Sequence, residues 1–240
     1  MKKAKILFYD IETSPNLAYV WGKWEQNVIA YKSEWEILSF AWKFQGDKSV
    51  KCLTRADYKD KTDKSLVIDL KRIMDSADLI VAHNGDQFDI KKSTARMIFH
   101  GLNPTRILKT IDTKKIAKKY FAFNSNSLND LGQYLGLGKK LSTGGFELWL
   151  GCLANNKKSW AIMAKYNKQD VVLLEKVYDK FRPWIHNHPN VAKLQDRGEC
   201  PKCGSKNVVK DGVRANSTNL AQQMRCKDCH GFYQTRYKKV

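Results

Sequence analysis

The stretch that decides the fold reads Lys5-Ile6-Leu7-Phe8-Tyr9-Asp10-Ile11-Glu12-Thr13-Ser14-Pro15, a short apolar run that ends on two carboxylates. A continuous apolar run of this length predicts a buried central strand. Asp10 and Glu12 are two positions apart, so on a strand they point to the same face. Two carboxylates at the edge of an apolar core cost free energy unless a cation offsets their charge. A divalent metal ion with oxygen ligands is the natural candidate. In the alternative, one acid is a turn residue and the other is solvated.

The overall charge of the chain points to a polyanionic partner. Its 240 residues include 43 Lys and Arg against 24 Asp and Glu, which gives a formal charge of +19. Nucleic acid is the commonest partner of such a protein, and a basic protein with no polyanionic partner is the alternative. Hydrophobic residues make up 42% of the chain, which is enough for a core. The length allows one large domain, or one domain with a small module.

The N-terminal segment does not read as a targeting signal. Its apolar stretch is broken by Asp10 and Glu12 and is shorter than the core of a signal peptide. We find no later segment of the length that a membrane span requires. We therefore expect a cytoplasmic protein without a membrane partner. In that compartment, six cysteines indicate metal ligands or buried thiols rather than disulfides.

Periodicity predicts an α/β fold in which helices flank a mixed sheet. Beyond the first strand, we expect strands at 37–44, 50–54, 78–82 and 106–111, and helices at 63–76, 90–100, 127–135 and 159–181. Strands 37–44 and 50–54 should form an antiparallel hairpin around Gly46-Asp47. The segment 138–151, rich in Gly and Lys, is interpreted as a mobile loop.

Aromatic residues follow the first strand. Tyr19, Trp21 and Trp24 come soon after Pro15, with Trp35 beyond them. Such side chains could stack on nucleic-acid bases. We favour the other reading, in which they pack under a long loop.

Further acidic residues should meet the first two. Sites in open α/β sheets form beyond the carboxyl ends of central strands. Asp89 follows the strand 78–82, and Tyr166 and Asp170 share one face of the last long helix. Asp112 also follows a strand, but capping or loop structure is its expected role.

At this point the chain resembles a known family, the DnaQ-like 3′–5′ exonucleases of the RNase H-like superfamily. The matching motifs are Asp10-Ile11-Glu12-Thr13, Asn84 through Phe88-Asp89, and Tyr166-Asn167-Lys168-Gln169-Asp170. The Tyr-x-x-x-Asp form is that of the tyrosine subclass, since the position of the histidine in the other subclass is Lys165 here. The resemblance covers about residues 4–182 and implies a five-stranded RNase H-like sheet.

The resemblance also implies roles for these residues. Two Mg²⁺ or Mn²⁺ ions would be bridged by Asp10, with Glu12 and Asp170 on one ion and Asp89 on the other. Tyr166 would orient the attacking water, and Thr13 and Asn84 would line the pocket for the terminal nucleotide. Two such ions can activate water and stabilise the leaving oxygen of a phosphodiester.

Four cysteines near the C-terminus predict a zinc site. Cys200 and Cys203 form one Cys-x-x-Cys pair and Cys226 and Cys229 form a second, 22 residues further on. This spacing is typical of a structural Zn²⁺ with four thiolate ligands, and the segment resembles a zinc ribbon. So short a segment cannot easily bury a core alone, so zinc would supply its folding energy.

We therefore expect an exonuclease domain at 1–184, a linker at 185–197 with solvated His186 and His188, and the ribbon at 198–240. Basic and aromatic residues of the ribbon could grip phosphates and stack on bases: Arg225, Phe232, Tyr233, Arg236, Tyr237, Lys238 and Lys239. A purely structural or protein-docking ribbon is the alternative.

The predicted function is a metal-dependent 3′–5′ exonuclease, with DNA favoured over RNA as substrate. Three alternatives stay open: a non-catalytic nucleic-acid-binding module, an exoribonuclease and a structure-selective endonuclease. The sequence sets no oligomeric state, and a monomer is plausible.

Overall fold

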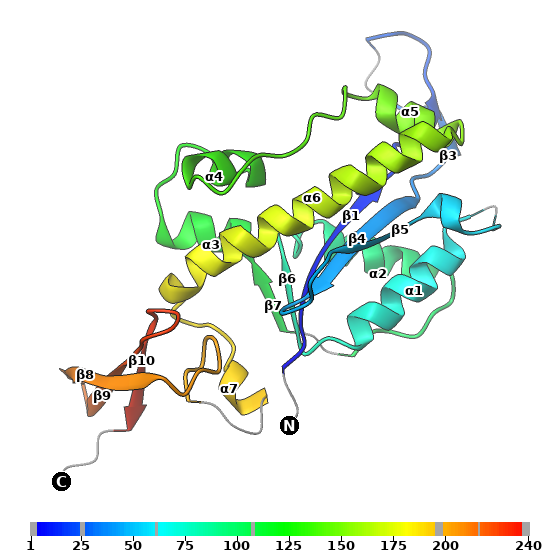
Figure 1. Ribbon diagram of the computed structural model, residues 1–240. Helices are drawn as coiled ribbons and strands as arrows, with labels where there is room; N and C mark the ends of the chain where they lie inside the picture. The colour runs from blue at the N-terminus through cyan, green and yellow to red at the C-terminus, as the bar shows by residue number, and fades with distance from the viewer. Residues whose placement is uncertain are drawn as a thin grey trace.

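The computed structural model describes residues 4–24, 27–60, 62–106, 109–194, 199–215 and 217–236. At its centre lies the mixed five-stranded sheet that the sequence predicts, in the order β5-β4-β1-β6-β7 (Figure 1). The strands are β1 (Ile6–Thr13), β4 (Ile37–Phe44), β5 (Lys51–Thr54), β6 (Leu79–Ala82) and β7 (Lys109–Asp112). β1 is antiparallel to β4 and parallel to β6. The β4–β5 hairpin is antiparallel, as predicted.

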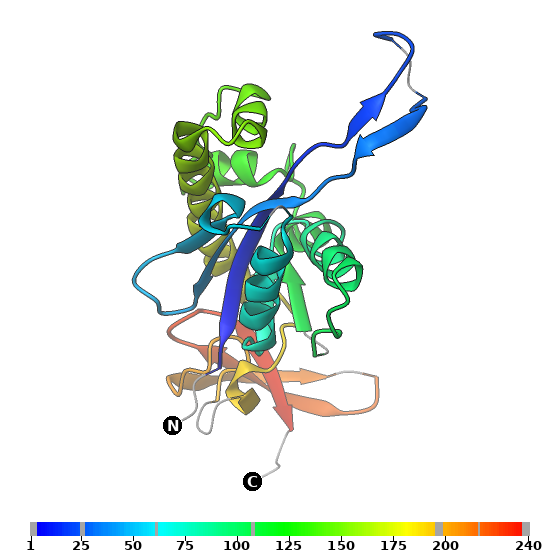
Figure 2. The same ribbon diagram turned by 90° about the vertical axis from the view of Figure 1, so that its right-hand side faces the viewer.

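Helices cover both faces of this sheet (Figures 1 and 2). They are α1 (Lys64–Asp75), α2 (Asp89–Phe99), α3 (Thr113–Tyr120), α4 (Leu128–Tyr134), α5 (Glu147–Leu153), α6 (Lys157–Phe181) and α7 (Val191–Leu194), with 3₁₀ turns η1 (Arg55–Asp57) and η2 (Arg182–Trp184). Alternation along β1 sorts its side chains. Leu7 and Tyr9 join the core under α1 and α2, whereas Ile6 and Phe8 join the core under α3, α4 and α6.

Three features differ from the sequence-based expectation. Helix α3 was not predicted, because its four lysines mask a short apolar stripe. The segment 138–151 is not simply a loop, since α5 begins at Glu147 and buries Leu148 and Cys152 against Trp160. Finally, Asp89 is the first residue of α2 rather than part of the loop before it.

The aromatic segment after β1 forms a projecting hairpin, not a packed loop. β2 (Leu17–Tyr19) pairs with β3 (Ala30–Ser33), and the pair extends away from the body of the molecule (Figure 2). Trp21 and Trp24 are 88% and 83% exposed, so our expectation that they pack under a loop is wrong. Trp35 does pack, against the core under α1 and α2. We call residues 16–34 the aromatic arm.

The C-terminal part is a three-stranded antiparallel sheet of β8 (Val208–Ala215), β9 (Leu220–Cys226) and β10 (Phe232–Arg236). The segment before it is partly packed rather than a solvated linker. His188 is buried and its Nε2 lies 2.8 Å from Tyr178 Oη, whereas His186 is exposed as expected. Lys202 Nζ donates to Pro183 O. The domain boundaries themselves stay a prediction.

A buried ion cluster joins α1, α2 and β4. Asp63 is fully buried and precedes α1. Its carboxylate accepts hydrogen bonds from Arg96 Nε at 2.8 Å and from the backbone N–H of Ile37 at 2.9 Å, and it lies 2.6 Å from His100 Nε2. Burial raises the pKa of Asp63, but these hydrogen bonds outweigh burial and leave the pKa lowered.

We expect Asp63→Asn to lower the free energy of unfolding by about 3–5 kcal/mol at neutral pH, since it removes the closer counterion of the buried Arg96 and leaves only Glu36 among the described residues, at 3.8 Å. The wild-type advantage should shrink as the pH falls through the folded-state pKa of Asp63, which lies below its unfolded value. Urea denaturation at several pH values measures both effects. Arg72→Ala removes an exposed ion pair with Asp69 and is the control, with a loss below about 1 kcal/mol. Equal losses for the two variants would contradict the analysis.

Candidate active site and cysteine cluster

Three carboxylates meet where β1 passes under α6. Asp10 and Glu12 continue the face of β1 that carries Ile6 and Phe8, and this is the face that α6 covers. Asp170 of α6 comes down onto the same spot. One carboxylate oxygen of each of these three residues lies within 4.8 Å of the others. The sequence prediction that these three acids converge agrees with this geometry.

Asn167 fixes α6 over the two strands. Its side chain is fully buried. The amide Nδ2 donates to Asp10 Oδ2 at 2.6 Å and to Asp10 O at 3.2 Å, and Oδ1 accepts from Ser39 Oγ of β4 at 3.0 Å. Since Asp170 lies one helical turn further on, the hydrogen bonds of Asn167 also set the position of the Asp170 carboxylate. Asn167 lies within the third motif, but no role was predicted for it, because a polar residue between two motif positions carries no pattern of its own.

Asp89 lies beside the three-acid group. It is buried at the start of α2, and its Oδ1 accepts a hydrogen bond from the backbone N–H of Ile11 at 3.1 Å. Ile11 separates Asp10 from Glu12, so this bond brings the Asp89 carboxylate against the same segment of β1. Among the described residues, the group within 4.8 Å does not include Asp89.

Lys140 reaches the site from the segment between α4 and α5. Its Nζ donates to Asp170 Oδ2 at 2.6 Å and to Tyr166 Oη at 3.2 Å. The backbone N–H of Lys140 is held in turn by Asn129 Oδ1 of α4, at 3.1 Å. No role was predicted for Lys140, since one lysine of a chain with 43 Lys and Arg carries no distinguishing signal.

The electrostatics of the site favour a cation. Burial, followed by repulsion from Asp89 and Glu12, raises the pKa of Asp10 well above its usual value. Burial and the nearby Asp170 raise the pKa of Glu12 to about 8, although Lys140 opposes the shift. Burial raises the pKa of Asp89 to about 7. Burial and the mutual repulsion of these carboxylates both disfavour their ionised forms, and Lys140 only partly opposes this.

The residues present suit a divalent metal ion. Asp170 Oδ1 is buried, and it has no hydrogen-bond partner among the residues that the structure describes. A buried carboxylate oxygen without a partner is costly, and coordination would satisfy it. Carboxylate oxygens of several segments around one point are also the ligands that Mg²⁺ and Mn²⁺ prefer. The acids at positions 10, 12 and 170 could therefore hold an ion, with Asp89 at its side.

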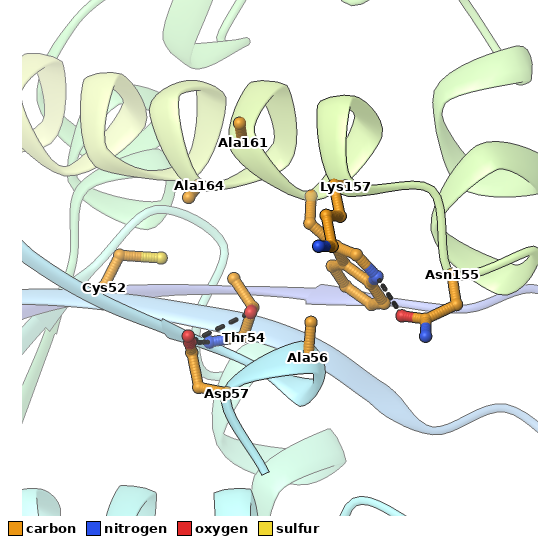
Figure 3. Close-up of a pocket in the computed structure, with 9 residues that line it drawn as sticks. Cys52, Thr54, Ala56, Asp57, Asn155, Lys157, Ala161 and Ala164 are labelled. Carbon is orange, nitrogen blue, oxygen red and sulfur yellow. Dashed lines mark hydrogen bonds between the residues drawn. The ribbon is translucent and has the colours of Figure 1, made fainter. Parts of the chain in front are cut away.

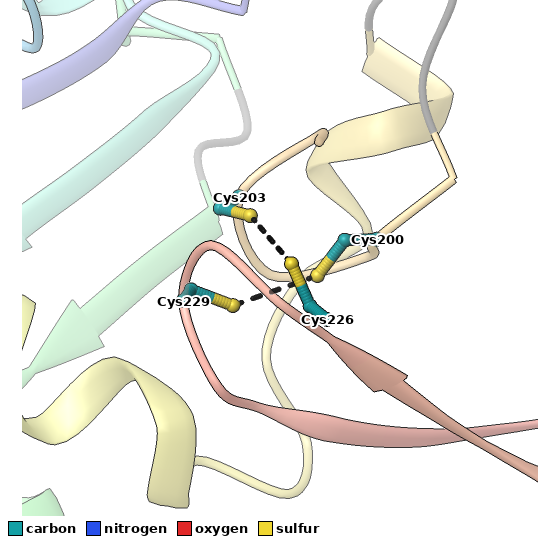
Figure 4. Close-up of side chains that lie close together, drawn as sticks. All are labelled: Cys200, Cys203, Cys226 and Cys229. Atoms are coloured by element: carbon teal, nitrogen blue, oxygen red, sulfur yellow. Dashed lines mark hydrogen bonds between the residues drawn. The ribbon is translucent and has the colours of Figure 1, made fainter. Parts of the chain in front are cut away.

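The four cysteines of the C-terminal part form a second cluster (Figure 4). All four sulfur atoms lie within 4.8 Å of one another, with Cys200 Sγ 3.7 Å from Cys229 Sγ and Cys203 Sγ 3.6 Å from Cys226 Sγ. Cys200 and Cys203 lie in the loop before β8, whereas Cys226 and Cys229 lie around the turn from β9 to β10. Four sulfurs gathered in this way fit a tetrahedral zinc site.

Comparison with known proteins identifies the family to which the chain belongs. The model of the RNase H superfamily matches residues 7–182. The chain belongs to the RNase H superfamily. The matched region holds Asp10, Glu12, Asp89 and Asp170, and it ends before the cysteine cluster.

Among solved structures, the chain is similar to the family B DNA polymerase from the hyperthermophilic archaeon Pyrobaculum calidifontis, with a TM-score of 0.54 and 16% sequence identity. The similarity covers 76% of this chain but only 25% of the polymerase chain, so what the two share is a fold. No match was found among curated protein sequences. Among the helices that the structure describes, none combines the length and apolar character needed to cross a membrane.

Two further residues of the predicted site lie at strand ends of this RNase H superfamily fold. Thr13 ends β1, and its carbonyl accepts from Trp149 Nε1 at 3.1 Å. Asn84 follows β6 with a left-handed φ of 65°, and its N–H donates to Asp112 Oδ1 at 2.9 Å. Asp112 also caps α3 by accepting from two backbone N–H groups, so its expected capping role is confirmed. Whether Thr13 and Asn84 contact a nucleotide stays a prediction.

The basic residues of the C-terminal part are only partly available. Arg225 pairs with Asp211 at 2.8 Å, and Tyr233 packs against the cysteine cluster. Arg236 and Phe232 are exposed. Tyr237, Lys238 and Lys239 lie outside the described residues.

A hollow of about 400 Å³ lies away from the acids, between the β5–η1 segment and the start of α6 (Figure 3). Cys52, Thr54 and Trp160 are among its lining residues, and none of the carboxylates of the predicted site is. Cys52 Sγ lies 3.9 Å from Asn167 Oδ1, so Asn167 stands between this hollow and Asp10. The hollow is therefore not the site of the acids.

The crowded acids lead to a test of the metal site. Without metal at pH 8, Asp10→Asn should raise the Tm, because it removes a charge whose raised pKa shows that ionisation costs folding energy. Each kcal/mol gained corresponds to about 2–4 °C. Added Mn²⁺ should raise the Tm of the wild type and leave that of the variant almost unchanged. Thermal unfolding with and without Mn²⁺ measures both. A lower Tm without metal, together with an intact Mn²⁺ response, would contradict this reading.

Proposed function

We propose that this protein is a metal-dependent 3′–5′ exonuclease that hydrolyses the phosphodiester bonds of nucleic acid, with DNA as the favoured substrate. The observation that carries the proposal is the meeting of Asp10, Glu12 and Asp170 within 4.8 Å, from a strand and a helix far apart in sequence. Membership of the RNase H superfamily and the charge of +19 support a nuclease-type role. The resemblance of the three motifs to DnaQ-like exonucleases of the tyrosine subclass supports the 3′–5′ direction.

In this proposal, the acids bind metal ions and Tyr166 positions the attacking water. Asp10, Glu12, Asp89 and Asp170 would hold two Mg²⁺ or Mn²⁺ ions. When bound, these ions would supply an activated water and stabilise charge on the leaving 3′ oxygen. Tyr166 lies one turn before Asp170 on the same face of α6. There its hydroxyl would orient the attacking water through a hydrogen bond. Burial and the nearby Asp170 raise the pKa of Tyr166 to about 12, so the phenol stays protonated at neutral pH.

Degradation of labelled strands tests the proposal. The wild type with Mg²⁺ or Mn²⁺ should shorten a 5′-labelled strand progressively from its 3′ end, whereas Asp10→Ala and EDTA should each stop the reaction. Tyr166→Phe should lower kcat by about 10²-fold with little change in KM, as expected for a group that positions a reactant. Tyr134→Phe, at an exposed tyrosine of α4, is the matched control. Single-stranded DNA and RNA are compared in parallel, and the faster polymer identifies the substrate.

Two other outcomes would replace the proposal. Binding without cleavage under every metal condition would make the protein a nucleic-acid-binding module. Cleavage of a circular strand, which has no end to digest, would make it an endonuclease.

We also propose that the four clustered cysteines bind one structural Zn²⁺ and that the C-terminal sheet is a zinc ribbon that helps to hold the substrate. The described residues of this part bury few side chains besides the cysteines themselves. The zinc–thiolate bonds would therefore supply much of its folding energy.

Native mass spectrometry should find one zinc per chain in the wild type. Cys226→Ser should abolish this zinc and make the segment 199–236 sensitive to protease, because the ligand set would be incomplete. Cys152→Ser, at a buried thiol in the core under α5 and α6, should keep its zinc. Equal zinc content in the two variants would rule out the assignment.

A further inference from the structure

The aromatic arm exposes apolar side chains that do not pack against the core of the protein. Every described residue from 16 to 34 is exposed. Besides Trp21 and Trp24, the exposed large side chains of the arm are Leu17, Tyr19, Val20, Val28, Ile29 and Tyr31. Large apolar side chains exposed together on one short segment often mark an interaction site. A two-stranded hairpin of three and four residues is also marginal in water by itself, so a bound partner would stabilise it.

The base of the arm is held to the body of the protein by hydrogen bonds, whereas the described part of the arm with Trp21 and Trp24 is not. The N–H of Trp35 donates to Asn16 Oδ1 at 2.8 Å, and Ser14 and Glu36 exchange hydrogen bonds across the base at 2.9 Å. Lys92 Nζ lies 3.5 Å from the ring centroid of Trp35. Trp35 is therefore part of the packed structure. Among the described residues, Trp21 and Trp24 make no such contact with the core, and their exposure of 88% and 83% gives them no packing role in the fold.

The arm grows directly out of the candidate active site. β2 begins at Leu17, four positions after Thr13 ends β1, so the arm continues the strand that carries Asp10 and Glu12. Figure 2 shows β2 and β3 prolonging β1 and β4 beyond the sheet. At about 3.3 Å per residue, Trp21 stands up to roughly 25 Å beyond Thr13. A ligand that reaches both the acids and the tip must be long and extended.

We infer that the aromatic arm is a stacking platform for bases of the polynucleotide several nucleotides away from the bond being cleaved. The inference rests on the proposed function. The chemistry of the arm suits base faces better than phosphates. Its described charged residues are Lys23, Lys32 and Glu34, which leave it nearly neutral, and Lys23 Nζ already lies 5.1 Å from the ring centroid of Trp24. The charge of +19 on the whole chain attracts the polyanion, and flat rings then hold it without regard to sequence.

The test compares a long substrate with a short one. The double variant Trp21→Ala/Trp24→Ala should weaken the binding of a 20-nucleotide single strand at least about tenfold, measured by fluorescence anisotropy in an Asp10→Ala background that cannot cleave. In the active background, its KM for the 20-mer should rise with kcat little changed. Cleavage of a labelled dinucleotide, which cannot reach the arm, should be unaffected.

Matched variants separate stacking from other effects. Trp21→Phe/Trp24→Phe keeps flat rings and should restore most of the binding. Tyr134→Ala removes an aromatic side chain of α4 that is 76% exposed, and it should bind the 20-mer like the wild type. Because both tryptophans are exposed, circular dichroism and Tm should not change in any of these variants.

Two results would overturn the inference. The first is unchanged 20-mer binding and KM in the Trp21→Ala/Trp24→Ala variant. The second is loss of self-association in sedimentation with nucleic-acid binding intact, which would make the arm a contact between two copies of this chain. The inference and the proposed function can fail separately. If the wild type binds the 20-mer through the arm but does not cleave it, only the proposed nuclease activity is wrong. If the wild type cleaves the 20-mer and the arm variants do so equally well, only the stacking platform is wrong.

Discussion

Mutual repulsion among buried and half-buried carboxylates is the constraint on which this molecule depends. β1 is buried on both faces, with Leu7, Phe8 and Tyr9 fully inaccessible, so the strand cannot shift to relieve Asp10 and Glu12. Helix α6 adds Asp170, and α2 adds Asp89. In the described part of the chain, the ammonium of Lys140 enters the group and pairs with Asp170. Such an arrangement stores unfavourable energy in the folded chain, which the hydrophobic cores on both sides of the sheet must offset. A cation bound between these carboxylates would relieve the repulsion, and this links the electrostatics to the proposed phosphodiester chemistry.

Asn167 makes that strained arrangement specific. Helix α6 is 25 residues long, and its apolar face alone would tolerate small slides along the sheet. The amide of Asn167 removes this freedom, because it bonds Asp10 of β1 and Ser39 of β4 at once while fully buried. A slide would leave those polar groups buried without partners. The distance between the acids of β1 and Asp170 is therefore set by a neutral hydrogen-bond network beside the charged one.

The features that the sequence predicted are those encoded by local patterns, and the features that it did not predict depend on contacts between distant residues. The apolar run of β1, the period of α6 and the Asp10-x-Glu12 spacing are local, and they correctly placed three acids on facing elements. Lys140 and Asn167 were missed because their roles arise only from contacts between residues distant in sequence. Helix α5 was read as loop because glycines next to it dominate the composition of 138–151. The aromatic arm was misread for a different reason: tryptophan is usually buried, and only the tertiary structure shows that Trp21 and Trp24 are exposed.

The two proposed substrate contacts lie at opposite ends of α6. The arm stands beyond the carboxyl end of β1, near the start of α6, whereas the C-terminal sheet adjoins the end of α6 through Pro183 and Lys202 (Figures 1 and 2). At 1.5 Å per residue the helix is roughly 37 Å long, and Asp170 lies about 17 Å before its end. A short oligonucleotide cannot touch both contacts. If both act, each holds a different part of a long polymer whose 3′ end lies at the acids. The arm and the C-terminal sheet would then add to substrate affinity as two linked sites, with the larger effect on the longest substrates.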